Sequence, residues 1–174
     1  MELRLSDAIL ILGKTPPCLD LLLRDLPDEW LRATEGQDTW GCYDVVGHFI
    51  HGELTDWIPR IQIILEHGAN RAFVPFDRFA QFRRDQKIPA GKLLDEFAIL
   101  RKQNLQRLAR LNLTARDFER PGAHPELGPV TLGQLISSWV VHDLTHLNQI
   151  HRVMAKQYAV AVGPWNEYLS ILSR

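Results

Sequence analysis

The 174-residue sequence contains only two cysteines, Cys18 and Cys42, and their spacing does not form a C-x-x-C pair. Two cysteines are too few for a disulfide framework of the kind that stabilises secreted domains. The scarcity of cysteine therefore fits a reducing compartment, and we expect a cytoplasmic location.

The sequence also lacks an excess of charge and any long apolar run. The net charge is -1 and 24% of the residues are charged, so bulk charge gives no argument for an anionic partner. Near the N-terminus Glu2 and Asp7 interrupt the sequence, and the apolar run is only AILIL. No later stretch approaches the roughly 20 apolar residues that a membrane helix needs. We therefore expect a soluble protein with no secretory signal, membrane span or nucleic-acid partner.

Apolar residues make up 45% of the chain and recur at spacings of three and four, which predicts a mostly or wholly helical protein. Gly13 ends a short first segment, and Thr15 is a candidate N-cap for the next helix. The remaining predicted helices run from about Tyr43 to His67 with a kink at Pro59, from Pro89 to near Asn112, and from the cap Thr131 to about Tyr158. Residues 164–173 are expected to pack across one end. We predict an all-α, four-helix bundle with long connections, forming a single domain over residues 1–174.

Three histidines fall within WVVHDLTHLNQIH, residues 139–151, on the last predicted helix. His142 and His146 are four residues apart, which is about 6 Å along a helix and about 40° around it, so the two rings share a face. His151 lies roughly 140° further round and cannot join them. The spacing is a standard way to present two imidazoles to one metal ion. It is equally compatible with a partly buried pair that hydrogen-bonds to neighbouring helices.

A second histidine pair, in VVGHFIHGE, favours the metal interpretation. His48 lies among core residues, where an imidazole needs a polar partner. His51 is about 60° away on the helix and could be a ligand, a group that supports a ligand, or a solvent-facing residue. With His48, the pair on the last helix would form a neutral set of three nitrogens, which suits Zn²⁺ or Ni²⁺ and leaves coordination positions open.

Two further side chains are candidates for supporting roles. Gln149 projects to the same face as His142 and His146, so it could line a pocket and orient a substrate, or merely bond a neighbouring helix. Asp143 points about 100° away from His142, which argues against joint coordination. It could instead bond another helix or orient a ligand imidazole.

The connection over residues 69–88 interleaves five basic residues with four phenylalanines. Such a pattern can bind single-stranded nucleic acid, but the slightly acidic chain argues against it. The phenylalanines could simply anchor the loop on the bundle. A third possibility is that the loop forms the rim of the metal pocket, with an arginine able to hold a substrate carboxylate.

The chain resembles the DinB-like superfamily of four-helix-bundle proteins. The similarity lies in TPPCLDLLLRDLPDEWL, TWGCYDVVGHFIHGELTDW and HDLTHLNQI, in that order. It implies a metal site formed by His48 from GHFIHGE and by His142 and His146 from HDLTH. Relatives include bacillithiol-dependent transferases and the mycothiol-dependent maleylpyruvate isomerases, and long-helix pairing in the family implies a homodimer.

Two functional hypotheses follow. The first is a metal-dependent transferase, in which a low-molecular-weight thiol cosubstrate attacks a small-molecule electrophile; a metal-dependent hydrolase would use the same ion to activate water. The second is a stress-associated bundle in which the metal only stabilises the helices. An exchangeable coordination position favours an enzyme, whereas a fourth protein ligand such as His51 favours the structural role.

Overall fold

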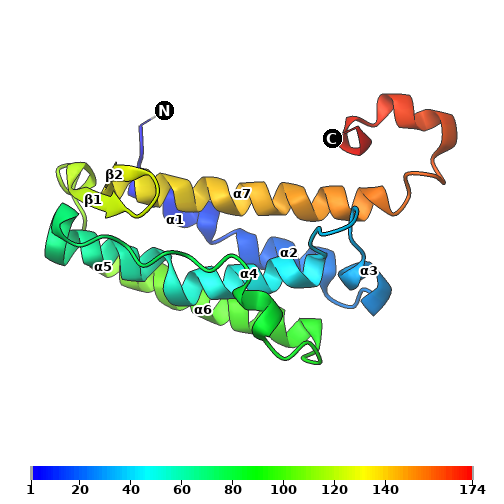
Figure 1. Cartoon of the computed structure of the whole chain (residues 1–174), viewed down its shortest axis with the longest axis horizontal. Helices are drawn as coiled ribbons and strands as arrows, with labels where there is room; N and C mark the ends of the chain where they lie inside the picture. The colour runs from blue at the N-terminus through cyan, green and yellow to red at the C-terminus, as the bar shows by residue number, and fades with distance from the viewer. Residues whose placement is uncertain (1, 174) are drawn as a thin grey trace.

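The computed structural model describes residues 2–173 and shows a mostly helical chain (Figure 1). Four lines of helix form the bundle: α1 and α2 in succession, α4 and α5 in succession, α6, and α7. The bounds are Leu5–Leu12 for α1, Thr15–Leu23 for α2, Cys42–Thr55 for α4, Trp57–His67 for α5, Ala90–Arg110 for α6 and Leu132–Lys156 for α7. The four-helix-bundle prediction is confirmed, with α6 and α7 close to their expected bounds.

The connections contain short elements of their own. A five-residue helix, α3 (Asp28–Arg32), precedes α4, and 3₁₀ turns lie at Gly68–Asn70 (η1), Ala80–Arg83 (η2) and Asp117–Glu119 (η3). The turn-rich segment before α7 forms an antiparallel hairpin of β1 (Pro121–His124) and β2 (Gly128–Thr131). No helix among residues 2–173 is long and apolar enough to cross a membrane.

The second long helix is interrupted instead of kinked. We expected one helix over residues 43–67 bent at Pro59, but the structure has two helices separated at Asp56, whose φ and ψ are -106° and -72°. Pro59 lacks the N–H that would bond to the carbonyl of Thr55, and its ring crowds that carbonyl. The helix is therefore distorted one turn before the proline, and Asp56 is one of the residues that line the large cavity described below.

The two predicted N-caps behave differently. Thr131 caps α7 in a capping box, in which its hydroxyl accepts from the Gln134 amide at 3.2 Å and Gln134 Oε1 accepts from the Thr131 amide at 2.9 Å. Thr15 was expected to cap α2 but is its first helical residue, and its side chain makes no cap bond. Its hydroxyl instead donates to Asp143 Oδ2 on α7, at 2.5 Å. This long-range bond could not be read from local sequence.

The chain beyond α7 forms two 3₁₀ turns, η4 (Gly163–Tyr168) and η5 (Ser170–Leu172). We expected this piece to pack across one end of the bundle, but Trp165 and Tyr168 are 70% and 79% exposed and Leu172 alone is buried. Figure 1 shows the segment leaving the end of α7 and turning back. The Lys156 ammonium donates to the carbonyl of Leu172 at 2.6 Å, which ties the return to α7.

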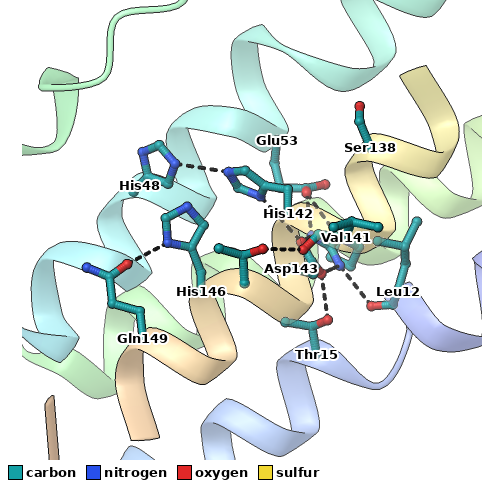
Figure 2. A network of polar contacts seen from close by, with 12 residues as sticks. Leu12, Thr15, His48, Glu53, Ser138, Val141, His142, Asp143, His146 and Gln149 are labelled. Atoms are coloured by element: carbon teal, nitrogen blue, oxygen red, sulfur yellow. Dashed lines mark hydrogen bonds and ion pairs between the residues drawn. The ribbon is translucent and has the colours of Figure 1, made fainter. Parts of the chain in front are cut away.

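The apolar core is divided into two clusters by a buried polar layer. One cluster includes Leu19, Phe49 and Phe97, and the other includes Leu12, Trp57 and Trp139. Between them, each of the four helical lines contributes at least one buried polar side chain, and the set is Thr15, Glu53, Arg101, Asn104 and Asp143. The histidine cluster described next lies at the same level of the bundle, on the face of α4 and α7 that borders the cavity (Figure 2).

Candidate metal centre

Three of the predicted histidines meet between α4 and α7 (Figure 2). His48, His142 and His146 can each offer one ring nitrogen such that the three atoms all lie within 4.8 Å of one another. The Nε2 atoms of His48 and His142 are 3.0 Å apart. Among residues 2–173, no other group of three histidine, cysteine or acidic side chains is arranged in this way. The arrangement of α4 and α7 therefore unites residues that are 94 positions apart in the sequence.

His48 and His146 are held in their neutral forms. Burial, followed by repulsion from His146 and His142, lowers the pKa of His48 to about 3. Burial and the neighbouring His142 likewise lower the pKa of His146 to about 4. Both imidazoles are therefore uncharged at neutral pH and keep a lone pair, which is the form that binds a metal ion.

Gln149 selects which nitrogen of His146 is available. Its Oε1 lies 2.7 Å from His146 Nδ1 (Figure 2). Because an amide oxygen can only accept, Nδ1 must carry the proton and Nε2 must carry the lone pair. The hydrogen bond thus orients the ring toward the other histidines. Gln149 also lines the cavity. Its side-chain hydrogen bond within residues 2–173 is to His146 on its own helix, and not to the neighbouring helix that the alternative interpretation required.

Asp143 is directed away from the cluster, into the polar layer. It is fully buried and accepts from Arg101 Nη1 and from Thr15, each at 2.5 Å. Its Oδ1 is 3.8 Å from His142 Nδ1, which is beyond hydrogen-bond distance. Of its two predicted roles, the structure shows the bond to other helices.

The donor set fits a metal ion. Two nitrogens 3.0 Å apart can both contact one ion, since this separation is less than twice the roughly 2.1 Å length of a zinc–nitrogen bond. The buried Nδ1 atoms of His48 and His142 have no hydrogen-bond partner among residues 2–173. Within residues 2–173 the only polar contact of the His48 ring is therefore the one with His142, so both imidazoles fit as ligands of one cation.

An open cavity of about 590 Å³ borders the histidines. Its wall includes Trp40 from the connection before α4, Phe76 from the 69–88 connection, and His124 from the hairpin. The Trp40 ring is stacked on His146, with centroids 6.2 Å apart and planes at 7°, and Phe76 meets His48 edge-on at 5.4 Å. The site is thus accessible from the cavity and bordered by aromatic rings, a combination typical of a small-molecule pocket.

The 69–88 connection forms part of this wall. It runs back along α5 and α4 (Figure 1), and η2 lies directly on α4. A Cβ atom at Gly47 would be 3.0 Å from Gln81 Cβ, so the glycine next to His48 permits this close approach. Phe73 is the one phenylalanine of the segment that is buried, whereas Phe79 and Phe82 are 59% and 45% exposed. Phe73 therefore anchors the segment on the bundle as one of the interpretations predicted, whereas Phe79 and Phe82 do not.

His51 lies outside the histidine cluster. Its ring contacts Phe76 at a centroid distance of 4.9 Å, and its Nε2 is 3.4 Å from the Thr55 hydroxyl on the same helix. The cavity wall also contains residues to which the sequence assigned no role, namely Trp40, Asp56, Arg60 and Arg152. Their distant positions in the sequence gave no signal, because only the folded bundle brings the α3–α4 connection, the start of α5 and the end of α7 to the same cavity.

A model of the DinB superfamily matches residues 12–150 of the chain. The chain belongs to the DinB superfamily. A solved DinB-like fold, YfiT from Bacillus subtilis, matches with a TM-score of 0.76 at 21% identity, covering 88% of this chain and 87% of that one. YfiT is described as a probable metal-dependent hydrolase with an unusual four-helix bundle topology. No curated protein sequence matches the chain.

Proposed function

We propose that this DinB-superfamily protein is a metal-dependent enzyme that acts on a small-molecule electrophile. The observation that carries the proposal is the convergence of three histidines on the wall of an open cavity. Three protein ligands leave room for an exchangeable ligand, as in catalytic sites. His51, the candidate fourth ligand, belongs to no metal-binding group among residues 2–173, which argues against a closed structural site.

A nitrogen-only donor set favours Zn²⁺ or Ni²⁺ over hard cations such as Mg²⁺. His48, His142 and His146 would hold the ion, and Gln149 would keep the His146 lone pair directed at it. When bound, such an ion favours the deprotonated form of a thiol or of water near neutral pH.

Our first candidate reaction is transfer of a low-molecular-weight thiol. The sulfur forms a bond to an electrophilic carbon, the bond from that carbon to its leaving group breaks, and the thiol proton passes to solvent. The aromatic side chains of Trp40 and Phe76 would hold the apolar part of the electrophile beside the histidines and limit the access of water. Membership of the DinB superfamily supports this candidate.

A second candidate is hydrolysis, and the fold similarity to YfiT favours it. Both reactions need the same histidines, and they differ in whether the nucleophile is a thiol or water. The cavity of about 590 Å³ has room for a small cosubstrate as well as an electrophile.

Elemental analysis of untagged protein tests the metal site. Wild type should contain about one equivalent of zinc or nickel, or take it up on addition, and the His142→Ala/His146→Ala variant should contain none. His151→Ala is the matched control, because His151 lies on the same helix, bonds to the Leu147 carbonyl and does not belong to the histidine cluster. Wild type that takes up no metal, or a double variant that retains it, would show the assignment to be wrong.

Activity assays on the zinc-loaded and nickel-loaded proteins then separate the reactions. Conjugation of cysteine or another small thiol to 1-chloro-2,4-dinitrobenzene, with release of chloride, reports thiol transfer. Hydrolysis of 4-nitrophenyl acetate without thiol reports the second candidate. Metal-bound protein that accelerates neither these reactions nor those of a wider panel of thiols, electrophiles and esters would instead support a metal that only stabilises the bundle.

A further inference from the structure

Three arginines line the cavity, and one of them differs from the others. Arg60 Nε lies 2.5 Å from the Asp56 carboxylate, and Arg152 bonds to both carboxylate oxygens of Glu35. Arg78, by contrast, makes no ion pair or side-chain hydrogen bond within residues 2–173. Two of the three guanidinium groups are thus already neutralised by carboxylates, whereas the donors of Arg78 remain available to a ligand.

Arg78 and the histidine cluster line the same cavity. It follows Phe76 in the connection that packs against α4 near His48, and both side chains line the cavity. An arginine with no ion pair among residues 2–173 therefore shares the cavity with the proposed reaction centre.

The surroundings of Arg78 combine this charge with apolar surface. Phe76 and Trp40 border the histidines on the same cavity wall, and both rings contact imidazoles of the cluster. A ligand seated against these rings could place an anionic group at Arg78 while another of its atoms reaches the histidines. A guanidinium binds a carboxylate through two parallel hydrogen bonds, which fixes orientation as well as charge.

We propose that Arg78 binds a carboxylate of the substrate, so that the protein acts on small compounds in which a carboxylate is joined to an apolar or aromatic part. That the bound carboxylate compound is a substrate rests on the proposed function. The binding site itself requires neither metal nor turnover. Two other charged side chains of the cavity wall, Asp38 and Glu126, make no ion pair within residues 2–173. They come from the α3–α4 connection and from the hairpin turn. Because both are acidic, they cannot bind a carboxylate.

Binding of a matched pair of probes tests the proposal. The probes are 3-phenylpropionate and its neutral amide, measured by ligand-observed NMR titration on protein treated with a chelator, so that no metal can hold the carboxylate. Wild type should prefer the carboxylate over the amide by at least about tenfold. Arg78→Gln should lose this preference without changing binding of the amide. Arg78→Lys, which keeps the charge but not the planar pair of donors, should retain part of it.

Arg71→Gln is the matched control, since Arg71 lies in the same connection, carries the same charge, and does not line the cavity. It should leave the preference unchanged. Equal binding of the two probes to wild type, or an undiminished preference in Arg78→Gln, would overturn the proposal. Because these measurements need no metal, failure of the metal site in elemental analysis and failure of the carboxylate site remain distinguishable.

Discussion

The helices α4 and α7 each contribute to two polar regions that differ in how completely their groups are bonded. Glu53 and Asp143 enter the polar layer, where Arg101 bonds to both carboxylates and Asn104 donates to Glu53 at 3.0 Å. His48 and His142 enter the histidine cluster, where their Nδ1 atoms have no partner in the described part of the chain. The layer is shut off from solvent, whereas the cluster borders a cavity.

Within one pair of helices, the polar layer is suited to stabilising the fold and the histidine cluster is the candidate functional site. A buried ionic layer whose groups are paired fixes how the helices align, because any shift would leave a charge without its partner. Buried imidazole nitrogens that have no hydrogen-bond partner cost stability unless something binds the cluster. The adjacent residues Asp143 and His142 illustrate the contrast. Asp143 accepts hydrogen bonds from side chains of α2 and α6, whereas the His142 ring faces the His48 ring on α4.

The largest expected effect comes from breaking the paired region. Arg101→Met keeps much of the side-chain volume but leaves Glu53 and Asp143 buried without their cation. We expect the free energy of unfolding to fall by about 3–5 kcal/mol, measured by urea unfolding in the presence of a chelator. Lys102→Ala, at the neighbouring exposed position on α6, should change it by less than about 0.5 kcal/mol. A loss below about 1 kcal/mol in Arg101→Met would mean that the layer does not fix the bundle.

The sequence predicted the histidine cluster more completely than the polar layer. Helical spacing places His142 and His146 on one face, and His48 is a polar residue within an apolar stretch, so each carries a local signal. Arg101 and Thr15 carry none, because an arginine on an amphipathic helix is normally exposed and a threonine before Pro16 normally caps. Their burial depends on contacts between helices far apart in the sequence.

The cavity wall was predictable only in part, for a related reason. The interleaved phenylalanines and arginines of residues 69–88 indicated a possible rim, but not which side chains would face inward. The break at Asp56 could be anticipated as a distortion from Pro59, but not placed one turn earlier without the folded backbone. Positions of residues on regular helices therefore follow from periodicity, whereas positions on connections depend on what they pack against.

Acidification should lower the free energy of unfolding of the metal-free protein through the histidine cluster, by less than the Arg101→Met substitution does. Because burial lowers the pKa of His146 to about 4, the native state binds fewer protons than the unfolded state between that value and the ordinary 6.5. The stability due to the neutral ring is thus complete above pH 6.5 and is lost as the pH falls toward 4. Between pH 7 and 5, chelated wild type should lose about 2 kcal/mol more than His146→Gln.

The measurement is urea unfolding of both proteins across this pH range. The buried carboxylates of the polar layer are present in both, so their titration cancels in the difference between the two curves. Parallel curves would contradict the low pKa of His146 and imply that the ring is more exposed to water than its surroundings suggest.

The smallest effect should come from the hydrogen bond that orients His146 within the proposed metal site. Gln149→Ala removes the acceptor for His146 Nδ1 and leaves that ring free to rotate or to present the wrong nitrogen. We expect zinc affinity to fall by about tenfold in competition with a chromophoric chelator, because loss of a ligand-orienting bond weakens metal binding without removing a ligand. Asn148→Ala, at the adjacent exposed position on α7, should leave the affinity unchanged. Equal affinities for Gln149→Ala and wild type would show that packing against Trp40 suffices to orient His146, and that Gln149 is free to serve the cavity alone.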